Sequence, residues 1–110
     1  MTMNETYSTS APSRAEIDAL DDFTLIEFGT AWCGHCRAAQ APLAEAMRDR
    51  QLRHLKIEDG PGRALGRSFR VKLWPTLVLM RRGEEVGRLV RPTSIEAIED
   101  LLRQADSSAI

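Results

Sequence analysis

The sequence predicts a single-domain α/β fold, in which a central mixed β-sheet is flanked by helices on both faces. The chain has 110 residues, enough for one hydrophobic core and too few for two. Apolar periodicities follow one another in the order helix, strand, helix, strand, helix, strand, strand, helix. The chain shows no internal repeat and no linker. We therefore expect one domain over residues 12–105, with a flexible arm over residues 1–11 and a frayed end over residues 106–110.

The first half of the chain contains two helix signals and a strand signal between them. Ser13-Arg14-Ala15-Glu16 fits a capping box at the start of a helix. Residues 23–28 are short and mostly apolar, as is typical of a strand covered on both faces. Residues 34–50 predict an amphipathic helix, which we expect Pro42 to kink because proline removes a backbone donor. Its apolar positions recur at three- and four-residue steps: Cys36, Ala39, Leu43 and Met47.

The second half predicts a strand, a short helix, a hairpin and a final helix. Gly83, in the hairpin turn, is available for a positive backbone angle. Thr93-Ser94-Ile95-Glu96 is a second capping box. In chain order, the predictions are a strand at 52–58, a turn at 59–62, a short helix at 63–70, paired strands at 76–80 and 85–90, and a helix that follows residue 93.

Composition and charge are those of a globular protein without an extended charged surface. Apolar residues make up 43% of the chain and charged residues 28%, and the formal net charge is -1. This balance favours neither nucleic acid nor a membrane surface as a partner. No apolar run approaches the ~20 residues that span a bilayer. Residues 1–10 are polar and lack the apolar core of a secretory signal, so we expect a cytoplasmic location.

The two cysteines of the chain, Cys33 and Cys36, are the strongest functional signal. They follow the first strand pattern and open the helical pattern at 34–50. Unpaired N–H groups and the helix dipole stabilise negative charge at a helix N-terminus, which favours the reactive thiolate of Cys33. One helical turn brings Cys36 beside Cys33, so the pair can close a disulfide reversibly.

Zinc binding is the other chemical interpretation of this pair. A structural zinc site needs four ligands, and the Cys and His residues available in the chain are Cys33, Cys36, His35 and His54. We do not expect these four side chains to converge in one chain, so we predict no metal. A site shared between two chains, with zinc or an iron–sulfur cluster, is left open.

Several motifs at suitable separations identify a family resemblance. Residues 28–36 resemble the signature of the thioredoxin superfamily, with the CGHC form typical of protein disulfide isomerase domains. Trp74-Pro75-Thr76, just before a predicted strand, is similar to the family's cis-proline segment. Gly83-Glu84 matches the hairpin of thioredoxins, and Glu27, six residues before Cys33, matches their buried carboxylate. The resemblance covers residues 14–104.

The resemblance implies a thioredoxin-like fold and thiol–disulfide exchange with protein substrates. It makes Cys33 the exposed nucleophile and Cys36 the half-buried cysteine that resolves the mixed disulfide. It also implies no bound cofactor, and an electron donor that is a reductase or another dithiol protein. We expect a monomer.

The substrate-binding residues are also taken from the resemblance. Pro75, in the cis form, and Thr76 present extended backbone for strand-like pairing with a substrate. Trp32 and Trp74 form apolar walls of the groove. We expect these residues to lie around Cys33.

The residues themselves suggest a third catalytic group, Glu27, and three modulating groups, Gly34, His35 and Lys56. Gly34 and His35 lie between the cysteines, and a partly positive imidazole at position 35 stabilises the Cys33 thiolate and the reduced state. Glu27 lies in an apolar strand, where burial raises a carboxyl pKa and lets it accept a proton from Cys36. Lys56, in the next predicted strand, is either a buried partner of Glu27 or solvated.

Three positions depart from the thioredoxin pattern. Gly29 stands where thioredoxins often have an aromatic residue, and Trp74 stands where a small or β-branched residue is usual. Arg91, counted from Gly83, falls where thioredoxins have a glycine beside the groove. We expect Arg91 to cover part of the groove or to select acidic partners.

The sequence therefore predicts a thiol–disulfide oxidoreductase that reduces protein disulfides, and two alternatives stay open. The CGHC form favours a disulfide isomerase or oxidase that uses the same residues. The departures at Trp74 and Arg91 favour a binding subunit whose dithiol is idle or regulatory.

Overall fold

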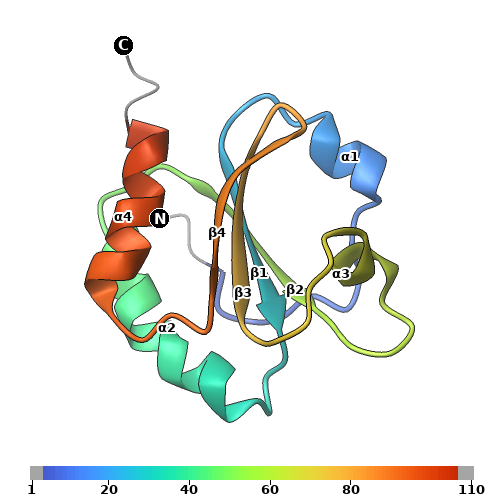
Figure 1. The fold of residues 1–110 in the computed structure, drawn as a ribbon, viewed down its shortest axis with the longest axis horizontal. Helices are drawn as coiled ribbons and strands as arrows, with labels where there is room; N and C mark the ends of the chain where they lie inside the picture. The colour runs from blue at the N-terminus through green and yellow to red at the C-terminus, as the bar shows by residue number, and fades with distance from the viewer. Residues whose placement is uncertain (1–3, 107–110) are drawn as a thin grey trace.

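The computed structural model describes residues 4–106, and its helices and strands follow the predicted order (Figure 1). None of the helices in this part of the chain is long and apolar enough to cross a membrane. The elements are α1 (Arg14–Asp18), β1 (Thr24–Gly29), α2 (Gly34–Met47), β2 (Arg53–Glu58), α3 (Ala64–Ser68), β3 (Thr76–Arg81), β4 (Glu84–Val90) and α4 (Ile95–Asp106).

The four strands form one mixed sheet in the order β2-β1-β3-β4. β1 pairs in parallel with β2 and antiparallel with β3, and β3 pairs antiparallel with β4. All six residues of β1 are buried, as predicted for a strand covered on both faces. The predicted mixed sheet is confirmed, and β1 is an inner strand that carries the site.

Helices cover both faces of the sheet: α2 and α4 pack on one face, and α1 and α3 on the other (Figure 1). Side chains alternate between faces along a strand, so Leu25 packs in the cluster with α2 and α4 whereas Ile26 packs in the cluster with α1 and α3. Glu27 has the same parity as Leu25. The strand therefore places its carboxylate under α2, the helix that starts at the cysteines.

Local sequence signals determine most of the element boundaries. Ser13 and Glu16 form the predicted capping box. Arg82 and Gly83, with φ of 51° and 80°, make the two-residue turn of the β3–β4 hairpin. The second capping box is wrong by one residue. Ser94, rather than Thr93, accepts the Ala97 N–H at 3.2 Å, and α4 accordingly begins at Ile95.

The N-terminal segment, residues 4–10, lies along the outer edge of β2 instead of extending freely as predicted. Ser8 forms a parallel bridge with Ile57. The Ser8 N–H donates to the Lys56 carbonyl at 2.7 Å, and the Glu58 N–H donates to the Ser8 carbonyl at 2.9 Å. An edge strand has unpaired backbone groups, which is why a polar segment without a hydrophobic pattern can dock there. Residues 1–3 and 107–110, parts of the predicted arm and frayed end, lie outside the described residues.

Candidate active site

Cys33 caps the N-terminus of α2. Its backbone is extended, with φ -79° and ψ 123°, and its Sγ accepts the Cys36 N–H at 3.3 Å. The first turn of the helix carries Cys36 back toward Cys33, as the spacing predicts. Both cysteines are free thiols in this structure. The dithiol thus lies where helix N–H groups stabilise negative charge.

The two thiols differ in exposure. Cys33 is 8% exposed and Cys36 is 1% exposed. Cys33 is the more exposed of the two cysteines, as predicted. Both side chains are nevertheless more buried than expected, and the prediction that Cys36 is half-buried is wrong. Cys36 lies on the buried side of α2 that also carries Ala39 and Leu43. Cys33 is therefore the more accessible of the two thiols.

The environments of the thiols move their pKa values in opposite directions. Burial acts to raise the pKa of Cys33, but hydrogen bonds from the Cys36 side chain and from the backbone N–H groups of Cys36 and His35, with the charge of Arg91, lower it overall. Burial, followed by the hydrogen bond that the Cys36 thiol donates to Cys33, raises the pKa of Cys36 to about 11. A single thiolate on Cys33 is thereby favoured.

The charge that acts on Cys33 comes from outside the CGHC loop. His35 is exposed and contributes to the lowered pKa of Cys33 through its backbone N–H, whereas the sequence predicts a contribution from its imidazole. The contributing cation is Arg91, at the end of β4. Inspection of the loop alone cannot identify this residue, since it follows Cys33 by 58 positions in the chain. Gly34, exposed at the first position of α2, has open space around its Cα.

Glu27 lies at the centre of a buried polar cluster and is 0% exposed. Oε2 accepts hydrogen bonds from the Tyr7 hydroxyl at 2.7 Å and from Gln40 Nε2 at 2.9 Å. Oε1 lies 3.0 Å from His54 Nε2. Lys56 Nζ lies 3.9 Å from Oε2 and donates to Gln40 Oε1 at 2.6 Å. Lys56 is thus a buried partner of Glu27, one of the two options left open by the sequence.

The pKa of Glu27 is lowered, which contradicts the prediction of a raised value. Burial acts to raise it, as predicted. Hydrogen bonds from His54, Tyr7 and Gln40, followed by the charge of Lys56, outweigh burial. The donors come from β2, α2 and the N-terminal segment, so the apolar strand around Glu27 does not reveal them. Glu27 is consequently an ionised acceptor at neutral pH.

Sequence reasoning missed three residues of this cluster, and two of them have a detectable signal. His54 alternates with Lys56 along β2, so both lie on the face that carries Glu27. Gln40 follows Cys36 by one helical turn and donates to its carbonyl at 2.8 Å. Tyr7 has no comparable signal, because it lies in a polar segment without periodicity. Both ring nitrogens of His54 are engaged, one with Glu27 and the other with the Asn4 N–H. His54 is therefore not available as a zinc ligand together with the cysteines.

Two tryptophans form the surface beside Cys33. The Trp74–Pro75 bond is cis, as the resemblance implies. Trp32 is 73% exposed and meets Trp74 edge to face, with ring centroids 5.7 Å apart. Trp74 Nε1 donates to Asp59 Oδ2 at 2.9 Å, which fixes the ring. Thr76, predicted to bind substrate, is buried, and its hydroxyl donates to the Leu73 carbonyl at 2.6 Å.

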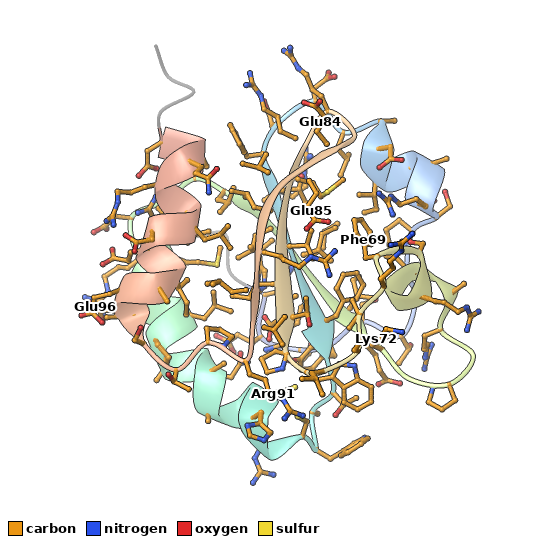
Figure 2. The ribbon with its side chains drawn as sticks, viewed as in Figure 1. Phe69, Lys72, Glu84, Glu85, Arg91 and Glu96 are labelled. Carbon is orange, nitrogen blue, oxygen red and sulfur yellow. The ribbon has the colours of Figure 1, made fainter. Side chains whose placement is uncertain are left out.

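Arg91 adjoins this surface from the end of β4 (Figure 2). Its backbone N–H donates to the Pro75 carbonyl at 2.8 Å, and its Nε donates to the Trp74 carbonyl at 2.9 Å. Its φ of 51° lies in the left-handed region that favours glycine. The prediction that Arg91 lies beside the groove is consistent with these contacts.

Gly29 ends β1 directly under the dithiol. A Cβ at this position would lie 2.6 Å from Cys36 Sγ and 2.7 Å from the Tyr7 hydroxyl oxygen. The departure from an aromatic residue therefore has a structural reason. The space above Gly29 is occupied by Cys36 and by Tyr7 from the N-terminal segment.

Comparisons with known proteins match both the sequence and the fold. The family model described as Thioredoxin matches residues 6–104. The solved structure of reduced thioredoxin 2 from Pseudomonas aeruginosa PAO1 is 54% identical, with a TM-score of 0.85, over 96% of this chain and 99% of that chain.

Two curated relatives extend the match. Thioredoxin H2-1 of Oryza sativa subsp. japonica is 32% identical over 94% of this chain and 83% of its own length. The bifunctional thioredoxin reductase/thioredoxin of Mycobacterium leprae is 29% identical over 74% of this chain and 18% of its own length.

Proposed function

Because this chain belongs to the thioredoxin family and is a thiol–disulfide oxidoreductase, we propose that Cys33 attacks substrate disulfides and that Cys36 resolves the product. The observation that carries this assignment is the difference between the thiols. Cys33 is the more exposed cysteine and has a lowered pKa, whereas the pKa of Cys36 is raised to about 11. The thiolate is the nucleophile in disulfide exchange, so Cys33 reacts first.

The reaction has two steps that balance in bonds and electrons. The Cys33 thiolate forms a bond with one substrate sulfur, and the substrate S–S bond breaks to release a thiolate. Cys36 then loses its proton and attacks Cys33 Sγ. The bond from Cys33 to the substrate breaks, the second substrate sulfur leaves as a thiolate, and the two electrons of the dithiol have reduced the substrate.

The proposed substrates are proteins with accessible disulfides, and the proposed electron donor is a thioredoxin reductase or another dithiol protein. The tryptophan surface supports an extended substrate segment beside Cys33, with Trp32 as its exposed apolar contact. The Mycobacterium leprae relative is named as both a reductase and a thioredoxin, which supports a reductase as donor. A monomer in the cytoplasm remains our prediction for the state in which the protein acts.

A disulfide oxidase or isomerase is the second candidate. The groups that lower the pKa of Cys33 stabilise the reduced form, and this makes the disulfide more oxidising. The CGHC sequence favours the same direction. A redox titration against glutathione separates the candidates: a potential near the ~-270 mV of a reductase supports our proposal, and one near ~-180 mV supports the alternative.

Insulin reduction by dithiothreitol tests the proposed activity. The intact chain should accelerate insulin precipitation, whereas Cys33→Ser should not. Cys36→Ser should instead accumulate a mixed disulfide on Cys33, which mass spectrometry of the trapped peptide locates. A mixed disulfide that forms on Cys36 in the Cys33→Ser variant faster than on Cys33 in the Cys36→Ser variant would reverse the assignment of roles, and equal rates would contradict it. An inactive intact chain would favour the idle-dithiol binding subunit.

A further inference from the structure

Tyr7 reaches the centre of the site from the N-terminal segment. Its hydroxyl donates to Glu27 Oε2 at 2.7 Å. The oxygen of this hydroxyl and Cys36 Sγ approach the same point above Gly29. Burial raises the pKa of both groups, and the contact between them adds to the raised pKa of Tyr7 and acts to lower that of Cys36. Tyr7 therefore lies between the resolving thiol and the buried carboxylate.

The position of this hydroxyl is fixed by contacts along the whole segment. The Asn4 N–H donates to His54 Nδ1 at 2.8 Å, and the Asn4 side-chain amide donates to the His54 carbonyl. Lys56 Nζ donates to the Glu5 carbonyl at 3.2 Å and lies 4.6 Å from the centre of the Tyr7 ring. The backbone of Ser8 pairs with β2 on the other side of Tyr7. These contacts anchor the segment both before and after the tyrosine.

The room for this arrangement comes from Gly29. Cys36 Sγ and the Tyr7 hydroxyl oxygen approach the same point above its Cα, 2.6 and 2.7 Å from where a Cβ would stand. A cavity of about 200 Å³ adjoins them, lined by Thr30 and Gln40 as well as by Tyr7 and Cys36. Its volume is large enough for water, and the polar side chains of Tyr7, Thr30 and Gln40 supply hydrogen-bonding groups for it. The site therefore has an outlet by which a proton can reach solvent.

We propose that Tyr7 is a further catalytic residue, which carries the proton from the Cys36 thiol to Glu27 while Cys36 resolves the mixed disulfide. The inference rests on the proposed function, in which Cys36 is the resolving thiol. It adds a residue that the sequence prediction of direct transfer to Glu27 did not contain.

The step balances as a single proton transfer coupled to disulfide exchange. In the mixed disulfide Cys33 no longer has the thiolate that accepts the Cys36 S–H, so this proton is free to turn to Tyr7. The Cys36 thiol proton moves to the Tyr7 oxygen as the Tyr7 hydroxyl proton moves to Glu27 Oε2. The electron pair on Cys36 Sγ forms the bond with Cys33 Sγ, and the bond between Cys33 and the substrate sulfur breaks. The leaving sulfur keeps the electron pair, and no external oxidant is needed. The proton on Glu27 then returns to the Tyr7 hydroxyl, which lines the cavity, and leaves from there to solvent.

The orientation of the Tyr7 hydroxyl suits this transfer. Because the hydroxyl donates to Glu27, its lone pairs remain available to the Cys36 thiol. Burial raises the pKa of Tyr7, so the phenol stays protonated and passes a proton along without ionising. The charged and titratable groups facing the pair are Glu27 from β1, His54 and Lys56 from β2, and Cys33 at the start of α2. Glu5 from the N-terminal segment and Arg37 from α2 also line the cavity beside them.

The two exchange steps can be followed separately with an aryl disulfide whose thiolate leaving group absorbs visible light. Reduced protein releases one arylthiolate when Cys33 attacks and a second when Cys36 resolves. We expect Tyr7→Phe to leave the first phase unchanged and to slow the second by about tenfold or more, since general acid–base groups contribute ~10²–10⁴-fold. The pH midpoint of the second phase should also rise. Tyr7→Phe keeps the ring over Lys56, so the segment should stay docked.

Ser8→Ala is the matched control, because it alters the same segment and leaves the Ser8 backbone bridge in place. It should leave both phases unchanged. A second phase of normal rate in Tyr7→Phe would overturn the inference, since water in the cavity would then suffice. Equal slowing of both phases would also overturn it, because that result indicates a structural role. Loss of the first phase in the intact chain would instead contradict the proposed function.

Discussion

The guanidinium of Arg91 donates a hydrogen bond to the backbone carbonyl of Trp74, with Nε 2.9 Å from the oxygen. The same carbonyl lies 4.0 Å from Cys33 Sγ. A substrate segment that pairs with the backbone next to Pro75 must therefore compete with Arg91 for this acceptor. The same side chain also lowers the pKa of Cys33. Under the proposed function, Arg91 would thus both occupy a substrate contact and activate the nucleophile.

Replacing Arg91 separates these two effects. Arg91→Gly frees the Trp74 carbonyl and suits the φ of 51°, so insulin turnover should rise a few-fold. Arg91→Lys keeps the charge but loses the Nε contact. The pKa of Cys33, measured by thiolate absorbance, should therefore change less in Arg91→Lys than in Arg91→Met, relative to the intact chain.

If Arg91→Gly leaves insulin turnover unchanged while Arg91→Met lowers it, the charge of Arg91 affects turnover more than its obstruction of the groove does. Equal turnover in all four proteins would mean that Arg91 does not act on the groove.

The effect of position 35 should depend mainly on its backbone N–H. His35→Pro removes a donor that lowers the pKa of Cys33, so it should raise that pKa and lower the reduction potential. Loss of one hydrogen bond of ~1 kcal/mol corresponds to about 20 mV in a two-electron couple. His35→Ala keeps the N–H and should shift the potential much less. Equilibration of each variant with glutathione measures the reduction potential. Equal shifts in the two variants would indicate that the imidazole of His35, rather than its backbone N–H, sets the potential.

Glu27 should make the stability of the protein depend on pH in the acidic range. Its pKa is lowered on folding, so the native state is stabilised above the unfolded value of about 4.3, and this stabilisation is lost as pH falls through the folded pKa. Glu27→Gln should lower the free energy of unfolding at neutral pH by about 3 kcal/mol, because Lys56 loses its buried counter-charge. Urea unfolding at a series of pH values gives the difference between the two proteins. That difference should shrink below pH ~4.3, and a constant difference would contradict the assignment.

Gly29 should tolerate no side chain. Gly29→Ala places a Cβ against Cys36 Sγ and the Tyr7 hydroxyl, and overpacking of this kind costs ~1–3 kcal/mol. Gly34→Ala is the matched control, since a Cβ there meets nothing within 4 Å and alanine favours the helix by ~0.5–1 kcal/mol. Thermal unfolding of both variants tests the contrast. A stable Gly29→Ala protein would show that Tyr7 can withdraw at little cost.

Features decided by neighbouring residues could be predicted from the sequence. The capping box at Ser13, the turn at Gly83 and the position of Cys33 before a helix depend on short spacings, and the structure has all three. The buried position of Glu27 also followed from the apolar strand around it.

Features decided by distant residues could not be predicted in the same way. The direction of the Glu27 pKa shift depends on donors from β2, α2 and the N-terminal segment, and it was predicted with the wrong sign. The charge acting on Cys33 comes from Arg91 across the sheet. Tyr7 lies in a polar segment whose docking depends on the free backbone groups of β2, which no local pattern records.

The bridge between Ser8 and Ile57 also affects how the protein meets other copies of itself. β2 is an outermost strand of the sheet, and an unprotected outermost strand is a template for pairing with strands of other molecules. The N-terminal segment occupies part of this edge with the chain's own backbone. Removal of the first ten residues would expose the hydrogen-bonding groups that Ser8 now pairs with, so we expect a truncated chain to aggregate more readily through intermolecular strand addition.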